Sequence, residues 1–244
     1  MSPERVTVVL PTYNELDNLR DVAAAVVAHG YHLLIVDDGS PDGTGELADE
    51  LTQGNEMIAV LHRPEKQGLG PAYAAGFDRV LAGEGDVVIE MDADFSHDPA
   101  DLPRLVEAVA NGADLAIGSR YVPGGATEGW SPIRKWVSKA GNLYARVMLG
   151  VPAKDITAGF RAFSQEALAR LPYRAAEASG YGFQVEMAWR AHEAGFTTVE
   201  VPVIFRDRQK GTSKMGLAIV AEAMWLVTVW GLGRMVRQVR SRTR

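Results

Sequence analysis

The sequence contains no cysteine, which excludes disulfide bonds and metal sites built on thiolates. It also lacks two familiar nucleotide-binding loops. Gly68-Leu69-Gly70 is followed by Tyr73 at the position where a dinucleotide fingerprint needs its third glycine, and no Gly-Lys-Ser/Thr phosphate loop occurs. Hydride transfer and ATP hydrolysis through such loops are therefore disfavoured.

Basic charge is scarce overall but is concentrated near one end of the chain. The net charge of −6 argues against a general nucleic-acid binder, although five arginines and no acidic residue lie between Arg234 and Arg244. The first residues show no basic stretch followed by an apolar one, so we expect the protein to stay in the cytoplasm. A chain of 244 residues can form one substantial core with an appendage.

Short apolar segments alternate with stretches of helical periodicity through the first half of the chain. We expect strands over residues 6–10, 33–36, 57–61, 87–91 and 115–117. Strands of this length separated by helices are typical of sheets whose strands run parallel. The pattern therefore predicts an α/β fold with a mainly parallel central sheet flanked by helices.

Polar residues gather where the expected strands end. They are found from Pro11, which we expect to end the first strand, to Glu15, at Asp37-Asp38, at Asp92-Ala93-Asp94 and at Arg120. Ligands of parallel sheets bind outside the carboxyl ends of the strands. One such strand end would be an ordinary turn, whereas four of them indicate a shared binding site.

Asp92 and Asp94 are the strongest candidates for metal ligands. In an extended chain they lie on the same side, so their carboxylates would converge and repel each other unless a cation lay between them. Hard oxygen ligands of this kind suit Mg²⁺ or Mn²⁺, usually with a phosphate sharing the ion. Taken alone, the motif is also compatible with a solvated loop that carries two charges.

The second half of the chain is less regular. Residues 122–132 are rich in glycine and proline and are expected to form a mobile loop, and a helix is expected over residues 134–149. Residues 197–205 predict a β-branched strand, and Pro202 within it indicates an edge position. Residues 206–214 are expected to form a flexible cationic loop.

The last segment, residues 215–244, is expected to form a long apolar helix with a basic tail. Its apolar stretch, 216–233, is at the lower limit for spanning a bilayer, and Glu222 weakens that interpretation. Trp225 and Trp230 are of a type favoured at membrane surfaces, so the helix could lie in the interface with its arginines on anionic headgroups. Packing on the rest of the chain or on a membrane-embedded partner subunit are the alternatives.

Together these motifs resemble the inverting glycosyltransferases of family 2, which have the GT-A fold, and among them the dolichol- or polyprenol-phosphate mannose synthases. The motifs of the first half are shared by much of the family, and those of the second half are more specific. The matching stretches are Leu10-Pro-Thr-Tyr-Asn-Glu15, Val36-Asp-Asp-Gly-Ser-Pro-Asp-Gly-Thr44, Gly68-Leu-Gly70, Met91-Asp-Ala-Asp94, Gly118-Ser-Arg-Tyr121, Asp155-Ile-Thr157, Gly159-Phe-Arg161, Gly182-Phe-Gln-Val-Glu-Met187 and Arg208-x-x-Gly-x-Ser-Lys214.

The resemblance implies that mannose passes from GDP-mannose to a polyprenyl phosphate of the dolichyl type, giving polyprenyl-phosphate β-mannose. It implies a catalytic GT-A domain over residues 1–214 and a membrane-associating or partner-binding helix over residues 215–244. The enzyme would lie in the cytoplasm, attached peripherally to the inner face of the membrane, and would not bind nucleic acid. The alternative within the family is a UDP-sugar-dependent undecaprenyl-phosphate glycosyltransferase.

The resemblance also implies roles for individual residues. Those implied to bind guanosine are Pro11, Tyr13, Glu15, Val36 and Asp38. Those implied to lie along the ribose and diphosphate are Asp92, Ala93 and Asp94, with Asp92 and Asp94 as ligands of Mg²⁺ or Mn²⁺. Those implied to act on the phosphates and the sugar are Asp94, Arg120, Arg208 and Lys214.

Three further positions carry their own expectations. Some relatives have a glutamine that completes the metal site, where this chain has Ser96. His97 is expected to cap a helix or face solvent, since an Asp-Pro pair follows it. Arg134 and Lys135 are expected to help bring the two polyanionic substrates together, with a solvated basic surface as the alternative.

Overall fold

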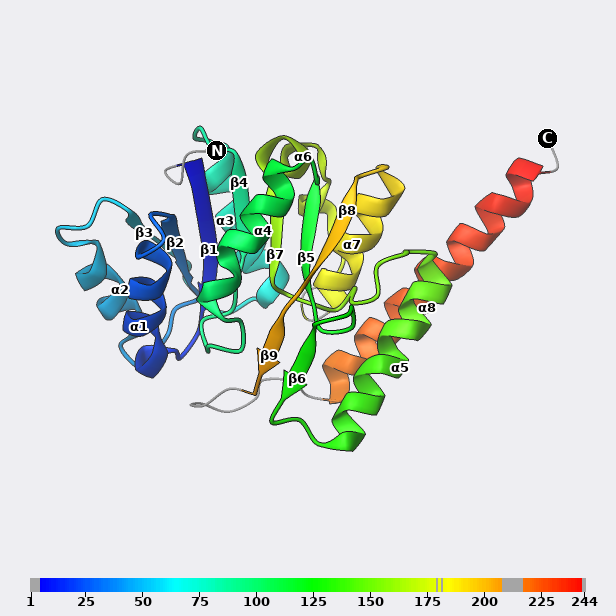
Figure 1. Ribbon diagram of the computed structural model, residues 1–244, viewed down its shortest axis with the longest axis horizontal. Helices are drawn as coiled ribbons and strands as arrows, with labels where there is room; N and C mark the ends of the chain where they lie inside the picture. Colours follow the sequence, from blue (N-terminus) through cyan, green and yellow to red (C-terminus); the bar gives the residue numbers. More distant parts are fainter. Residues whose placement is uncertain (1–4, 179, 181, 208–216, 243–244) are drawn as a thin grey trace.

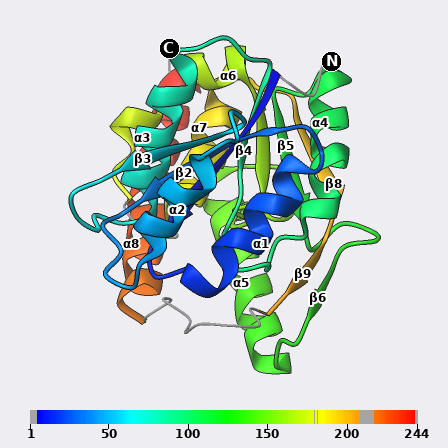
Figure 2. The ribbon, with the colours of Figure 1, turned by 90° about the vertical axis from the view of Figure 1, so that its left-hand side faces the viewer.

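The structure is a computed structural model that describes residues 5–178, 180, 182–207 and 217–242. Helices cover both faces of a seven-stranded central sheet (Figures 1 and 2). The strand order is β3-β2-β1-β4-β7-β5-β8, and every neighbouring pair is parallel except those made by β7. The strands are β1 (Val6–Thr12), β2 (His32–Asp37), β3 (Ile58–His62), β4 (Val87–Glu90), β5 (Leu115–Ser119), β7 (Arg161–Ser164) and β8 (Thr198–Pro202).

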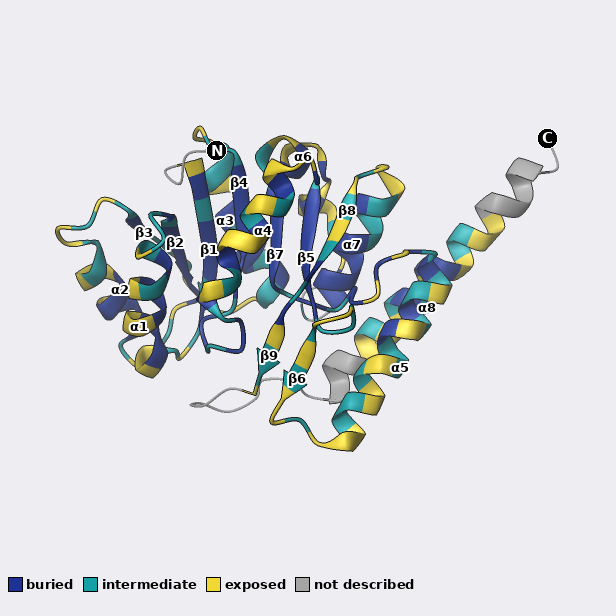
Figure 3. Ribbon diagram, in the orientation of Figure 1, coloured by how far each residue is buried: buried dark blue, intermediate teal, exposed yellow. Residues whose placement is uncertain are grey.

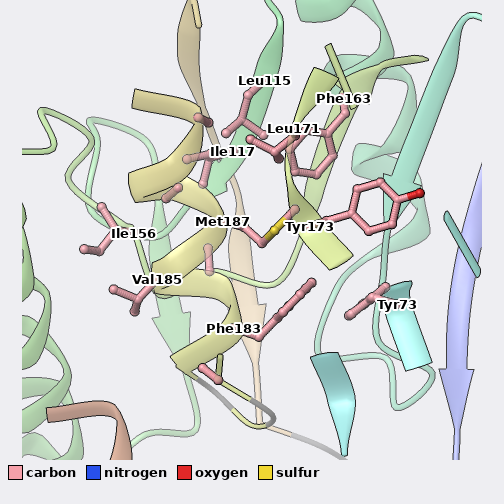
Figure 4. Packing of buried hydrophobic residues seen from close by; sticks show 14 of the residues in the cluster. Tyr73, Leu115, Ile117, Ile156, Phe163, Leu171, Tyr173, Phe183, Val185 and Met187 are labelled. Atoms are coloured by element: carbon pink, nitrogen blue, oxygen red, sulfur yellow. The ribbon is translucent and has the colours of Figure 1, made fainter. Parts of the chain in front are cut away.

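The sheet divides the interior into two hydrophobic cores. Helices α1, α2 and α4 cover one face, and α3, α5, α7 and α8 contribute to the core on the other (Figures 3 and 4). Since the parallel strands run the same way, their carboxyl ends meet at the lower edge in Figure 1. The helices are α1 (Leu16–Val27), α2 (Thr44–Thr52), α3 (Leu69–Leu81), α4 (Leu102–Ala110), α5 (Pro132–Leu149), α6 (Gln165–Arg170), α7 (Gly182–Glu193) and α8 (Leu217–Arg242), with 3-10 turns η2 (Pro99–Asp101) and η3 (Tyr173–Ala175).

The predicted fold class is confirmed, and so is the edge position of β8, which contains Pro202. The expectation that Pro11 ends the first strand is wrong. β1 continues to Thr12, because its pairing with β4 stops at Val9 and Pro11 pairs with Val36 of β2. A proline is tolerated where the ladder does not need its missing N–H.

Two short pairings were not predicted. β7 is antiparallel to both β4 and β5, and it separates these two strands. The expected loop over residues 122–132 contains β6 (Ala126–Glu128), which pairs in parallel with β9 (Ile204–Arg206). This two-stranded ribbon places the segment after β5 against the segment after β8.

The predicted C-terminal helix is α8, which lies beside α5 (Figures 1 and 2). One of its faces is part of the core. Trp230 is 8% exposed, stacks on Trp189 with ring centroids 5.4 Å apart, and donates a hydrogen bond to Glu177 Oε2 at 3.1 Å. The division at residue 214 stays a prediction. Within the described residues, no helix has the length and apolar character needed to cross a bilayer.

The two tryptophans of α8 provide a matched stability test. Trp230→Ala should lower the free energy of unfolding by about 3–5 kcal/mol, because it removes a buried aromatic side chain and leaves a cavity. Trp225 is 69% exposed, so Trp225→Ala should change it by less than about 0.5 kcal/mol. Urea unfolding of the full-length variants measures both. Equal losses would show that α8 does not pack as described.

Candidate active site

The segments that follow β1 and β2 form one continuous surface at the carboxyl edge of the sheet. The Asn14 N–H donates to Ser40 Oγ at 3.0 Å, and the Glu15 N–H donates to Thr44 Oγ1 at 3.0 Å. Asn14 adopts φ = 56°, a left-handed conformation that asparagine tolerates in tight turns. These bonds fix the first two strand ends relative to each other.

The predicted guanosine-binding residues of the first strand lie on this surface. Pro11, Tyr13 and Glu15 are half-buried, so each keeps an accessible side. The ammonium group of Lys66 lies over the Tyr13 ring, 4.1 Å from its centroid. Glu15 Oε2 accepts a hydrogen bond from Asn18 Nδ2 at 3.2 Å, which orients the carboxylate. An aromatic ring and an oriented carboxylate suit a nucleobase.

The two predicted residues from the second strand are less accessible than expected. Val36 is fully buried in the core beside α3, so in this structure its side chain offers no surface to a ligand. Asp38 is also buried, and its carboxylate is paired with the guanidinium of Arg63. Burial raises the pKa of the Asp38 carboxyl, and Arg63 opposes that shift. Any nucleotide contact by Asp38 would therefore be shared with Arg63.

Asp92 and Asp94 lie in a turn after β4, which ends at Glu90. The expectation that they belong to an extended chain is wrong, because β4 has ended and Ala93 and Asp94 form a turn, after which Phe95 has a left-handed φ of 59°. Asp94 is buried, and its Oδ1 accepts the Ser96 N–H at 3.0 Å. The side chain of Asp92 is 33% exposed, and Ala93 between them is buried.

The oxygen atoms of this turn fit a hard divalent cation. Besides the two carboxylates, the buried hydroxyl of Ser96 makes no hydrogen bond with any described residue. A hydroxyl can act as a metal ligand or bind a metal-bound water, and the Ser96 N–H already contacts Asp94. The Ser96 hydroxyl is therefore a further oxygen atom close to Asp94.

His97 lies in the interior, so the expectation that it caps a helix or faces solvent is wrong. Its ring stacks on Phe160 with centroids 4.9 Å apart, and its Nδ1 accepts the Asp92 N–H at 3.1 Å. Burial lowers the pKa of His97, which keeps the imidazole neutral near pH 7. The cap of η2 is Asp98, whose Oδ1 accepts the Ala100 N–H at 3.0 Å. His97 thus fixes the backbone of Asp92 through this hydrogen bond.

Arg120 directly follows β5, and Asp155 holds it in place. Its Nε and Nη2 donate to the two Asp155 oxygens at 2.7 and 2.6 Å, and its backbone N–H donates to Oδ2 at 2.9 Å. Thr157 Oγ1 accepts a further bond from Nη2 at 2.8 Å. The rings of Trp130 and Phe205 lie 5.4 and 5.5 Å from the guanidinium carbon. Arg120 is therefore fixed in one orientation.

A pocket of about 560 Å³ opens beside Arg120, between the end of β5 and α5. We call it the basic pocket, because five of the described residues that line it are basic and none is acidic. Lys135 lies in it, and its expected role toward the substrates stays a prediction, whereas Arg134 pairs with Asp207 at 3.0 Å and stacks on Trp130. The basic residues are Arg120, Lys135, Lys139, Arg146 and Lys154.

The predicted cationic loop is described only at its start. Arg206, the last residue of β9, pairs with Asp98 at 2.6 Å and Glu128 at 3.2 Å, so it ties the turn after Asp94 to the β6–β9 ribbon. Arg208 and Lys214 lie outside the described residues. Their expected contacts with the phosphates and the sugar stay predictions.

Comparison with known proteins decides the family. The sequence pattern described as glycosyl transferase family 2 matches residues 7–171. The chain belongs to glycosyl transferase family 2. The matched range contains the first two strand ends, the Asp92–Asp94 turn, Arg120 and Asp155. It therefore covers most of the site described above.

Two curated relatives cover nearly the whole of this family 2 chain. The polyprenol monophosphomannose synthase of Mycolicibacterium smegmatis is 49% identical over 238 residues, which are 96% of this chain and 90% of the relative. The undecaprenyl-phosphate mannosyltransferase of Micrococcus luteus is 48% identical over 240 residues, 98% of each protein.

Two solved structures show the same fold at lower identity. A mannosyltransferase from Pyrobaculum calidifontis, in complex with GDP-Man and Mn²⁺, superposes with a TM-score of 0.61 at 18% identity, covering 97% of this chain and 66% of that one. The GalNAc transferase T7, with UDP, GalNAc and Mn²⁺, gives 0.56 at 16% identity, covering 87% and 45%. The GT-A fold expected for this family 2 member is confirmed.

Sequence analysis assigns no individual role to several residues that shape the site. Asp155 stands out there only as part of a motif, because its partner Arg120 is 35 residues away. Glu90, the last residue of the otherwise apolar strand β4, is another such residue. It is fully buried, and burial raises its pKa to about 7, although Arg161 and Gln184 oppose the shift. Its position before Asp92 was the available signal.

The pair of Asp155 and Arg120 generates a stability prediction. Asp155→Ala should lower the free energy of unfolding by about 3–5 kcal/mol, because it leaves a largely buried guanidinium without its partner. Glu50→Ala breaks the exposed pair with Arg20 and should cost less than about 0.5 kcal/mol. Chemical denaturation of both variants compares them. Similar small losses would mean that the buried pair is not needed to hold Arg120.

Proposed function

We propose that this family 2 glycosyltransferase moves mannose from GDP-mannose to the phosphate of a polyprenyl lipid and inverts the anomeric carbon. The observation that carries the proposal is the basic pocket. It adjoins Arg120 at the carboxyl edge of the sheet, and its lining includes the exposed apolar residue Leu143 of α5. A lipid phosphate matches both features, because its phosphate is negatively charged and its chain is apolar. The names of both curated relatives support the same reaction.

The donor would bind across the carboxyl edge of the sheet. Tyr13 and Glu15 would contact the guanosine together with Pro11, with Asp38 acting through Arg63. Asp92 and Asp94 would hold Mg²⁺ or Mn²⁺ beside the diphosphate. A bound divalent ion would offset the negative charge of the GDP leaving group as a Lewis acid.

The acceptor makes a strong general base unnecessary. The second pKa of a phosphate monoester is about 6, so the acceptor is already a dianion near neutral pH. One of its oxygens attacks the anomeric carbon, the bond from that carbon to the GDP oxygen breaks, and the configuration inverts from α to β. The remaining requirement is to hold two polyanions together, which the cations of the basic pocket would meet.

The donor nucleotide is tested by a direct comparison. The enzyme should transfer mannose from GDP-mannose to polyprenyl phosphate in the presence of Mg²⁺ or Mn²⁺, and turnover of UDP-glucose or UDP-aminosugars should be at least about 100-fold lower. Product analysis should find the β anomer. Preferential use of a UDP-sugar would contradict the proposal and favour the undecaprenyl-phosphate alternative.

Two controls separate the metal site from the rest of the protein. Asp94→Ala should abolish transfer and remove metal-dependent GDP binding, because it deletes the buried carboxylate of the turn. Calorimetry with GDP, with and without EDTA, should show the same loss in the unaltered enzyme. GDP affinity that survives EDTA would count against the metal.

A membrane surface is the proposed location of the acceptor. Within the described residues, five large apolar side chains of α5 and six of α8 are exposed, compared with three elsewhere. These two helices lie side by side (Figures 1 and 2), and we propose that their exposed residues together provide one apolar face. The residues are Ile133, Trp136, Val137, Leu143, Val147, Met224, Trp225, Val229, Leu232, Met235 and Val236. We define them as the α5–α8 face and propose that it rests on the inner leaflet.

Vesicle binding tests this face. Trp136→Gln and Trp225→Gln should each reduce co-sedimentation with anionic vesicles about tenfold, because each indole side chain contributes buried apolar area. Val199→Gln, a change at an exposed apolar residue on the edge strand β8, is the matched control and should bind vesicles normally. If all three variants sediment like the unaltered protein, the α5–α8 face is not the membrane contact.

A further inference from the structure

Gln184, in the first turn of α7, is a buried polar residue that the structure does not explain. It is 1% exposed, and its amide makes no well-aligned hydrogen bond with any described residue, although the buried carboxyl of Glu90 lies beside it. Glu186, two positions later, provides the contrast. Its carboxylate accepts the N–H groups of Glu177 and Ala178 at 2.9 and 3.0 Å and two bonds from Arg190. Glu186 is a structural residue, whereas the Gln184 amide, beside the Glu90 carboxyl, keeps hydrogen-bonding capacity that its well-aligned contacts do not satisfy.

The amide borders the turn that carries the carboxylates. A Cβ atom built on Gly159 would lie 3.8 Å from Gln184 Nε2, 4.0 Å from Asp92 Oδ1 and 3.6 Å from His97 Cε1. Gly159 itself is half-buried, so this position is close to the surface of the protein. Its φ is not in the left-handed region, so another residue could adopt the backbone. What the glycine provides is space between Gln184 and Asp92.

The chemistry of the amide selects the kind of group that could enter this space. A carboxamide offers donors and an acceptor together, which matches hydroxyl groups, because each hydroxyl also donates and accepts. A phosphate accepts hydrogen bonds only, and cations are its preferred partners. In a nucleotide-sugar donor, the sugar is bonded directly to the diphosphate that is placed at Asp92 and Asp94. Its hydroxyls, together with those of the ribose at the other end of the diphosphate, are therefore the donor groups of the matching kind.

We infer that Gln184 is a specificity-determining residue that hydrogen-bonds a hydroxyl of the donor's sugar, in the space that Gly159 leaves open beside Asp92. The inference rests on the proposed function, since it takes GDP-mannose as the donor. The carboxyl of Glu90 lies next to the amide, and Arg161 lies close to that carboxyl. Arg161 donates to the carbonyl oxygens of Ala158 and Ile156 at 2.8 Å, which holds the backbone next to Gly159.

Gln184→Met tests the inference, because it keeps the length of the side chain and removes both polar atoms. kcat/KM for GDP-mannose should fall about 10- to 100-fold, the usual effect of leaving a substrate hydroxyl without its partner. The affinity for GDP, which has the ribose but lacks the mannose, should not change. The thermal midpoint should stay equal or rise, since an unsatisfied buried amide is removed. Glu186→Gln is the control in the same helix and should lower the midpoint without altering donor preference.

GDP-mannose analogues that each lack one hydroxyl identify the contact. The unaltered enzyme should lose about 10- to 100-fold in kcat/KM with at least one analogue, and Gln184→Met should show no further loss with that same analogue. Gly159→Ala is an independent second variant. Its added methyl group makes only ordinary contacts at 3.6–4.0 Å, so the protein should fold, but it occupies the space and should weaken GDP-mannose binding more than GDP binding.

The experiments distinguish a failure of the proposed function from a failure of the role assigned to Gln184. If the unaltered enzyme does not turn over GDP-mannose, the proposed function and this inference are both overturned. If it does, but Gln184→Met keeps its full kcat/KM or responds to every analogue as the unaltered enzyme does, the inference on Gln184 alone is overturned. Non-additivity confined to one hydroxyl supports it.

Discussion

The buried ion pair between Arg120 and Asp155 is the interaction on which the site depends. Arg120 belongs to the carboxyl edge of the central sheet, and Asp155 follows α5, the helix that carries three of the five basic residues of the basic pocket. The backbone N–H of Asp155 is in turn held by Glu200 of β8 at 3.0 Å. Because a buried charge needs its partner, the sheet edge and the pocket cannot move apart without a large cost. The proposed donor site at the sheet edge and the proposed acceptor site in the basic pocket are thus held together by this ion pair.

The second constraint is the double role of α8. One face of the helix packs Val227 and Trp230 into the core, and the opposite face exposes Trp225 and Leu232 (Figure 3). Packing on the domain and contact with a membrane were alternatives in the sequence, but the two faces make them compatible. The packed face also contacts α7, the helix that carries Gln184. The surface that we propose to face the lipid is therefore attached to the domain by a helix that packs against α7, next to the proposed donor site.

Local patterns predicted most of the fold, since alternating apolar segments and their polar ends depend on nearby residues. The parts that were missed depend on distant partners. β7 has four residues and begins with Arg161, so it becomes a strand only because β4 and β5 pair with it. The environment of His97 depends on Phe160 in the same way. Asp92 and Asp94 were predicted from their spacing, although a turn rather than a strand positions them.

The central claim is that the basic pocket binds the phosphate of the lipid acceptor, separately from the donor. The most direct measurement is the KM for a short, soluble isoprenyl phosphate in a Lys139→Gln/Lys154→Gln double variant, assayed without vesicles so that membrane binding does not contribute. Each lost contact to a charged phosphate is worth about 1.5 kcal/mol or more, so KM should rise at least about tenfold while the Kd for GDP-mannose stays unchanged. An unchanged acceptor KM, or an equal loss of donor affinity, would contradict the account.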